Sequence, residues 1–168
     1  ESSFIESYYQ ESLASGNRIR DELSKAVKIS LHSLGNGFLK HTSNDVLRAA
    51  IQSGKLSAFE FNHSLLRLIY RLLFLMVTEE RDLLFDDDSG KDAQRFRNIY
   101  KRFYSIEKLR KLSGIRHLSE PQYADLWQGM MNTFKLFEPG GNGPKLGIAP
   151  LGGELFNEVA LGDLNKSQ

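Results

Sequence analysis

Cysteine is absent from this chain of 168 residues, and proline occurs only four times. Without cysteine the chain can form neither disulfides nor thiolate metal sites, a composition typical of a reducing compartment. We therefore expect a cytoplasmic protein. The longest uninterrupted apolar run, Leu72–Val77, is too short to cross a bilayer, so we expect no membrane partner. An initiating methionine is also missing, which we interpret as the start of a piece cut from a longer polypeptide, although N-terminal processing would give the same start.

The overall composition is that of one ordinary globular domain. Hydrophobic residues make up 40% of the chain and charged residues 26%, and the net charge is +1. A chain of this length can bury a substantial core. The net charge is too small to indicate a class of partner.

Apolar residues recur at helical spacing along most of the chain, and no segment shows the alternation of a strand. Glycines and capping residues divide the pattern into helices. The first predicted helix covers residues 3–34, as one helix or as a pair broken near residues 15–17, and is stopped by Gly35 and Gly37. A short helix follows between Ser43 and Gly54. The remaining predicted helices are 57–84, one around 96–103, one around 106–112, and 123–137.

The segment 57–84 is the most apolar of these, and Ser57 and Glu60 have the spacing of a capping box at its start. A helix that is apolar nearly all round is expected at the centre of a bundle. Arg67 and Arg71 lie within it, and a buried charge without a partner is very unfavourable. We interpret both as structural buried charges that bind carboxylates or helix-end carbonyls of neighbouring helices.

Three prolines and six glycines lie between Glu138 and Gly153, which excludes an α-helix there. We expect an extended loop, a short helical turn near 154–158, and frayed last residues. The predicted organisation is a helical domain over 1–137 and a loop and tail over 138–168 that leads toward a missing downstream domain. The predicted fold is all-α: an irregular bundle of about five to seven helices around the central helix, with an extended Gly/Pro-rich C-terminal tail.

Positive charge is concentrated in residues 91–116, which contain nine basic and two acidic residues and carry +7, leaving −6 for the rest of the chain. Exposed arginine and lysine side chains could neutralise DNA phosphates. The DNA-backbone candidates are Arg95, Arg97, Lys101, Arg102, Lys108, Arg110 and Lys111. The alternative is a solvated basic face balanced by acids elsewhere. Aromatic residues interleave with these charges at the spacing of a buried stripe, which favours core packing over base stacking: Phe96, Tyr100, Phe103 and Tyr104.

No motif for catalysis or metal binding is complete. Residues 86–92 place oxygen ligands at alternate positions but lack the glutamate and the glycine placement of an EF-hand, so we favour a mobile acidic loop. The four histidines are scattered without metal-ligand spacing. No acidic residue stands two positions before a lysine, no Pro-Pro pair occurs, and no serine has a motif-level base. We therefore predict no catalytic residue, no metal ligand and no cofactor in this chain.

Four segments resemble, in the same order, the helical region of large bacterial restriction–modification methylases, the type IIG enzymes and their relatives in phage-defence systems. The first segment is the central leucine-rich helix. The second is similar to the family's Tyr-Tyr-Ser-Leu-x-x-Leu-Arg motif. The third is similar to its tyrosine–aspartate–leucine–tryptophan segment, and the fourth to its leucine–glycine–glycine–phenylalanine turn. These segments are Leu65–Leu75 with Glu79–Leu84, Tyr100–Arg110, Tyr123–Trp127 and Leu146–Phe156.

The resemblance implies a parent protein that uses S-adenosylmethionine to methylate adenine N6 in DNA, with or without DNA cleavage. In that family the helical region lies between a nuclease module and the methylating domain. Both modules are absent here, so no catalytic residue can be carried over. The expected function is a non-catalytic connector that packs against other domains of the same polypeptide and braces them on double-stranded DNA. The alternative is a structural protein–protein interaction domain without DNA contact, suggested by the aromatic face Tyr123–Phe137.

Overall fold

The computed structural model describes residues 4–85, 92–115, 124–151 and 153–167. The described residues are mainly helical and contain no β-strand, which confirms the predicted all-α fold. The α-helices are α1 (Phe4–Lys40), α2 (Asp45–Gln52), α3 (Ala58–Glu80), α4 (Ala93–Phe103), α5 (Ile106–Ser113) and α6 (Asp125–Phe137), followed by the 3₁₀ helices η2 (Gly143–Leu146) and η3 (Glu158–Lys166). No helix in this described part of the chain has the length and apolar character that crossing a bilayer requires.

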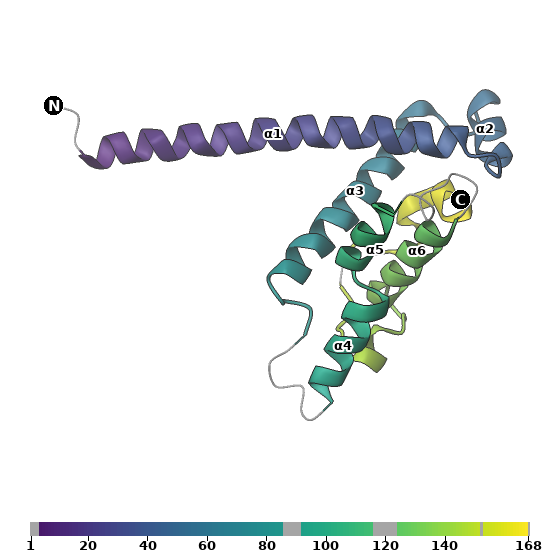
Figure 1. Cartoon of the computed structure of the whole chain (residues 1–168). Helices are drawn as coiled ribbons and strands as arrows, with labels where there is room; N and C mark the ends of the chain where they lie inside the picture. The colour runs from purple at the N-terminus through teal and green to yellow at the C-terminus, as the bar shows by residue number, and fades with distance from the viewer. Residues whose placement is uncertain (1–3, 86–91, 116–123, 152, 168) are drawn as a thin grey trace.

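Helix α1 is long and projects well beyond the remaining helices, which form a body at its C-terminal end (Figure 1). Of the two predicted alternatives for this segment, the structure has the single helix, without a break near residues 15–17. The predicted stop at Gly35 and Gly37 is wrong, because the helix continues to Lys40. Gly35 is buried against α3, where an added Cβ would lie 3.3 Å from Leu65 Cδ1. The glycine therefore lets the two helices approach closely instead of ending α1.

The C-terminal end of α1 is held by polar side chains from α2 and its cap. Arg48 donates hydrogen bonds to the carbonyls of Leu39 (3.0 Å), His41 (2.6 Å) and Thr42 (3.2 Å). Asn44 donates to the Phe38 carbonyl at 3.0 Å. The carbonyls at the last turn of a helix have no partner within the helix. These side chains satisfy them and fix the direction in which α1 leaves the body.

Helix α3 begins at the predicted capping box. The Ser57 hydroxyl accepts from the Glu60 backbone N–H at 3.2 Å, and the Glu60 carboxylate accepts from the Ser57 N–H at 2.9 Å. One side of the helix is buried in the core, including Leu65, Leu68 and Leu75. Contrary to the expectation of a helix buried all round, the opposite side of α3 is partly exposed.

The body forms where α4, α5 and α6 pack with α3, and its centre is aromatic. Tyr100 lies edge-on to Phe85 and Phe137, with ring centroids 5.8 and 6.2 Å apart. Phe134 and Phe137 both contact Phe156, at 6.3 and 5.6 Å between centroids. Edge-on and tilted arrangements are those that aromatic rings favour in protein cores.

The segment after α6 is part of this core, and the prediction of frayed last residues is wrong. Helix η3 continues to Lys166 and packs against α3, and the buried residues of the segment are Ile148, Phe156, Ala160, Leu161 and Leu164. Gly141 and Gly143 fold the chain back against the end of α6, where an added Cβ would collide with the carbonyl oxygens of Lys135 and Leu136. The glycines that suggested a loose tail instead allow a close return of the chain.

Candidate functional site

Arg71 is the most deeply buried charge in the described chain, with 0% of its surface exposed. Its guanidinium donates to the carbonyls of Leu155 (2.6 Å) and Asn157 (2.7 Å) and lies 4.0 Å from the Glu138 carboxylate. It also lies over the rings of Phe134 and Phe156, 5.2 and 5.4 Å from their centroids. Desolvation by burial lowers the pKa of Arg71, and the charge of Glu138 partly opposes that shift.

Arg67 lies one turn earlier, is only half-buried, and donates to the Ala160 carbonyl at 3.1 Å. Both arginines therefore bind carbonyls of the segment 155–160, and Arg71 also pairs with the Glu138 carboxylate. The sequence predicted carboxylates or helix-end carbonyls as their partners. Together they attach the C-terminal segment to α3. These hydrogen bonds go to the protein's own backbone, whereas Nη1 of Arg71 is buried without a hydrogen-bond partner among the described residues and lies 4.0 Å from the Glu138 carboxylate.

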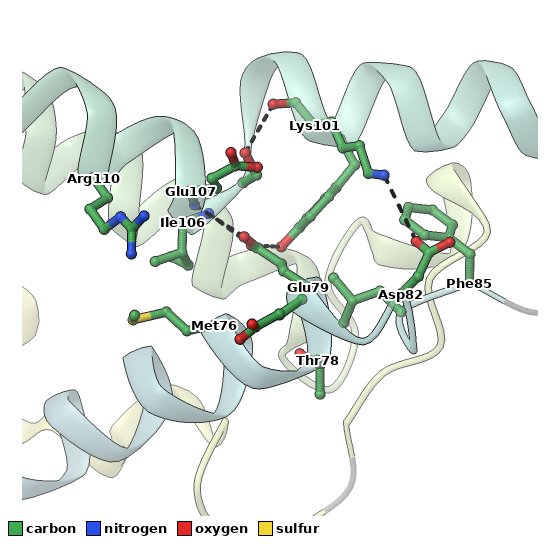
Figure 2. A pocket seen from close by; sticks show the side chains of 13 residues that line it. Met76, Thr78, Glu79, Asp82, Phe85, Lys101, Ile106, Glu107 and Arg110 are labelled. Carbon is green, nitrogen blue, oxygen red and sulfur yellow. Dashed lines mark hydrogen bonds and ion pairs between the residues drawn. The ribbon is translucent and has the colours of Figure 1, made fainter. Parts of the chain in front are cut away.

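A cleft of about 440 Å³ lies between the C-terminal end of α3 and the α4–α5 turn. Figure 2 shows Glu79 directed from α3 toward the start of α5. One oxygen of its carboxylate accepts from the Tyr100 hydroxyl at 2.7 Å and the Ile106 N–H at 2.8 Å, and the other accepts from the Glu107 N–H at 3.0 Å. These are the first N–H groups of α5, which have no partner within that helix.

Glu79 therefore acts as a tertiary cap that joins three helices. A carboxylate at a helix N-terminus also interacts favourably with the helix dipole. Burial, the charge of Glu79 and the hydrogen bond to it raise the pKa of Tyr100 far above its ordinary value. Sequence reasoning missed this role, because the glutamate and the N–H groups are far apart along the chain and no local motif joins them.

The composition of the cleft does not favour an anionic ligand. Four acidic and two basic side chains line it: Glu79, Glu80, Asp82, Glu107, Lys101 and Arg110. Asp82 forms ion pairs with Arg97 at 2.6 Å and Lys101 at 4.0 Å, the second of which Figure 2 marks with a dashed line. The best-placed carboxylate, Glu79, already accepts three hydrogen bonds. Of the hydroxyl groups that line the cleft, those of Thr78 and Ser105 donate to backbone carbonyls, and that of Tyr100 donates to Glu79.

The predicted DNA-backbone residues divide into two groups in the structure. Arg97 points into the protein, where it binds Asp82 and contacts the Phe85 carbonyl at 3.5 Å, and only 17% of its side chain is exposed. Lys101 extends toward the same aspartate. Lys111 pairs with Glu107 at 2.6 Å across one turn of α5. Each of these three cations pairs with an acidic side chain of the protein, although the side chains of Lys101 and Lys111 are still 61% and 71% exposed.

The second group is directed outward. Arg95 and Arg102 are exposed and lie seven residues apart on α4, which places them on one face of the helix. Within the described part of the chain neither forms an ion pair. Arg110 is also exposed on α5, and it lies beside the cleft. Arg95 and Arg102 are the sequence-predicted cations most available to an external anion.

Phe103 departs from the predicted buried stripe, because 54% of its surface is exposed while Tyr100 is buried. The Arg102 guanidinium and the Lys108 ammonium lie 5.3 and 5.8 Å from its ring centroid. Lys108 also donates to the Phe103 carbonyl at 3.4 Å. An exposed aromatic ring is therefore held between two cations at the end of α4, a surface group that the periodicity alone did not indicate.

The predicted acidic loop over 86–92 lies almost wholly outside the described residues. Among the residues that are described, no group of three or more histidines and carboxylates is placed to hold a metal ion. His41 uses Nδ1 to accept from the Ser43 N–H at 3.3 Å, which is a local turn contact.

Sequence reasoning did not identify two stripes of exposed apolar side chains. One runs along the projecting half of α1, and the other along the side of α3 that faces away from the core. Helical spacing in α1 was visible in the sequence. Spacing alone does not reveal whether the rest of the chain reaches far enough to cover such a stripe.

No known protein family, no curated protein and no solved structure matches the chain.

Proposed function

We propose that this chain is a non-catalytic helical connector that braces a DNA-methylating parent protein on double-stranded DNA. In this proposal the parent uses S-adenosylmethionine to methylate adenine N6, and the connector supplies contacts to other domains and to the DNA backbone. The ordered set of four segments that resemble restriction–modification methylases supports the parent. The observation that carries the DNA contact is the outward pair Arg95 and Arg102 on α4, exposed and without an acidic partner within the described residues.

Two arginines two turns apart on a helix can each contact a phosphate and displace the counterions bound there. Such contacts carry no base specificity, so they would position the parent rather than select its sequence. The affinity should be weak for the isolated chain and should fall as salt increases. Arg97 is excluded from this contact, because its ion pair with Asp82 holds it inside the protein.

The direct test is a titration of a fluorescent DNA duplex with the full chain at several low salt concentrations. The double variant R95A/R102A should bind more weakly, and the slope of log K against log salt should fall by roughly one for each arginine removed. The matched control is K55A/K145A, which removes the same charge from exposed lysines elsewhere. If the wild-type chain does not bind, or if both double variants lose affinity equally, the proposed contact is wrong.

The second candidate is a structural interaction domain without DNA contact. The face that first suggested it is covered within the chain, since Phe134 and Phe137 are buried and Trp127 packs edge-on against Phe38 with ring centroids 5.0 Å apart. Its support now comes from the uncovered apolar stripes of α1 and α3. These two functions are compatible, because the stripes and the outward arginines lie on different helices.

A further inference from the structure

We propose that the projecting half of α1 pairs antiparallel with α1 of a second copy of this chain. This proposal does not depend on DNA contact. It rests on three observations: an uncovered helix, an apolar pattern on that helix that is complementary to itself, and a second apolar stripe on α3 where the paired helix would reach the body.

Residues 9–26 of α1 are all exposed, and contacts with the body begin only near Val27. Figure 1 shows this part of the helix extending away from the other helices. The exposed surface includes large apolar side chains, among them Tyr9 at 57%, Leu13 at 47% and Leu23 at 50%. These three residues and Val27 fall on one side of the helix, the side that carries Leu31, Leu34 and Phe38 into the core. Gly16 and Arg20 lie on the same side, between Leu13 and Leu23.

A helix of this composition is not expected to be stable in water without a partner. Most of the stability of protein helices comes from packing an apolar face, and the exposed part contains Gly16 and Asn17, which have low helix propensity. Helical structure through these residues is explained if another surface covers the stripe. A partner helix with the same apolar spacing fits this surface best.

The stripe has the symmetry that a two-fold axis requires. Tyr9 and Val27 are equally distant in sequence from residue 18, and so are Leu13 and Leu23. In an antiparallel pair centred there, Tyr9 of one copy would lie beside Val27 of the other, and Leu13 beside Leu23. A symmetric dimer interface pairs each patch with itself in this way. A chain that evolved only to receive an unrelated partner has no need of this pattern.

Charges beside the stripe follow the same arrangement. Glu6 and Lys28 are both exposed and lie on the same flank of the stripe, near opposite ends of the uncovered segment. An antiparallel pair brings each glutamate close to the lysine of the other copy, whereas a parallel pair places like charges together. Complementary flanking charges commonly set helix orientation in this way.

The second stripe extends the surface into the body. On α3 it includes Phe59 (75% exposed), Tyr70 (50%) and Val77 (48%), at helical spacing opposite the buried residues. Phe74 (39% exposed) lies at the edge of this stripe, where its ring also packs against the buried Phe156. In Figure 1 the free end of α1 projects on the side of α3 away from α5 and α6. The partner's α1 would therefore enter a corner with apolar residues on both sides. Continuous apolar surface of this kind marks an interaction site.

The first experiment measures the mass of the full chain by light scattering or sedimentation over a range of concentrations. We expect a concentration-dependent dimer. L23E should raise the dissociation constant by at least about tenfold, because it buries a charge at the interface. The matched control is I29E on the opposite side of the same helix, where Ile29 is 70% exposed. I29E should leave the dimer unchanged.

The second experiment reads the orientation and uses the absence of native cysteine. L13C and L23C are prepared separately, oxidised alone, and oxidised as a mixture. An antiparallel pair predicts that the mixture forms the mixed disulfide far more readily than either variant links to itself. A wild-type chain that is monomeric at all concentrations, equal effects of L23E and I29E, or self-linking of L13C would each overturn the proposal. None of these results depends on whether the chain binds DNA.

Discussion

At the scale of single residues, the strongest interactions join groups far apart in the sequence. Glu79 joins α3, α4 and α5 through three hydrogen bonds, and Arg71 attaches the C-terminal segment to α3 through two carbonyls. Removing one partner of such a group leaves the other buried and unsatisfied, which is costlier than losing a surface contact. These few polar contacts therefore define how the helices are arranged.

The Tyr100 hydroxyl provides a prediction about alkaline pH. Burial and the neighbouring Glu79 raise the pKa of Tyr100 in the folded protein, whereas in the unfolded chain it ionises near about 10. Its contribution to stability is therefore fully present below about pH 10 and is lost as pH rises further. Each pH unit above that point should lower the free energy of unfolding by about 1.4 kcal/mol from this group alone.

Urea unfolding between neutral and strongly alkaline pH measures this effect. Y100F should be less stable at neutral pH, because Glu79 loses a hydrogen bond, but its stability should decline less steeply above about pH 10. Y70F is the matched control, since Tyr70 is 50% exposed and is not among the groups that donate to Glu79. Parallel alkaline curves for the wild type and Y100F would show that Tyr100 ionises freely in the folded chain.

At the scale of elements, η3 is an integral part of the core. Leu161 is fully buried, whereas Val159 on the same helix is 74% exposed. L161A should lower the free energy of unfolding by about 2–5 kcal/mol through lost burial and a cavity. V159A should change it by less than about 0.5 kcal/mol. Chemical denaturation of the two variants compares them directly, and similar small effects would mean that η3 does not pack as described.

Elements with their own local signals could be predicted from the sequence. The capping box at Ser57 and the apolar spacing of α3 are complete within a few residues of each other, and the structure confirms both. The structural role of the glycines could not be predicted from the residues next to them in the sequence. Gly35 lies in a helix because Leu65 packs against it, and Gly141 lies in a return of the chain because α6 ends there. In both cases the tertiary neighbour decides the role of the residue.

The candidate site could likewise be predicted only where a local pattern was sufficient. Periodicity correctly placed Tyr100 in the core but also placed Phe103 there, although the structure exposes it beside Arg102 and Lys108. Charge counting identified a basic segment, but it could not separate Arg97, which pairs with Asp82 inside the protein, from Arg95. Which cations face outward depends on where α3 ends relative to α4, and that is a tertiary property.

At the scale of the whole molecule, the two ends of the chain differ in what the fold requires of them. The first part of α1 extends away from the body with every side chain from residue 9 to residue 26 exposed, whereas the segment after α6 closes the core (Figure 1). Tolerance to truncation depends on burial and hydrogen bonding rather than on position in the sequence. The two ends should therefore respond oppositely to deletion.

A variant that begins at residue 24 should keep the helical body, because every side chain from residue 9 to residue 23 that it loses is exposed. A variant that ends at Phe137 should fail to fold, because it removes Phe156 and Leu161 and both carbonyl acceptors of the buried Arg71. Circular dichroism on heating and the spread of amide resonances in NMR spectra show whether each truncated variant folds. A cooperative transition in the C-terminal truncation would show that residues 1–137 form a domain by themselves, as the sequence first suggested. Loss of that transition would instead make residues 138–167 an indispensable layer of a single folding unit.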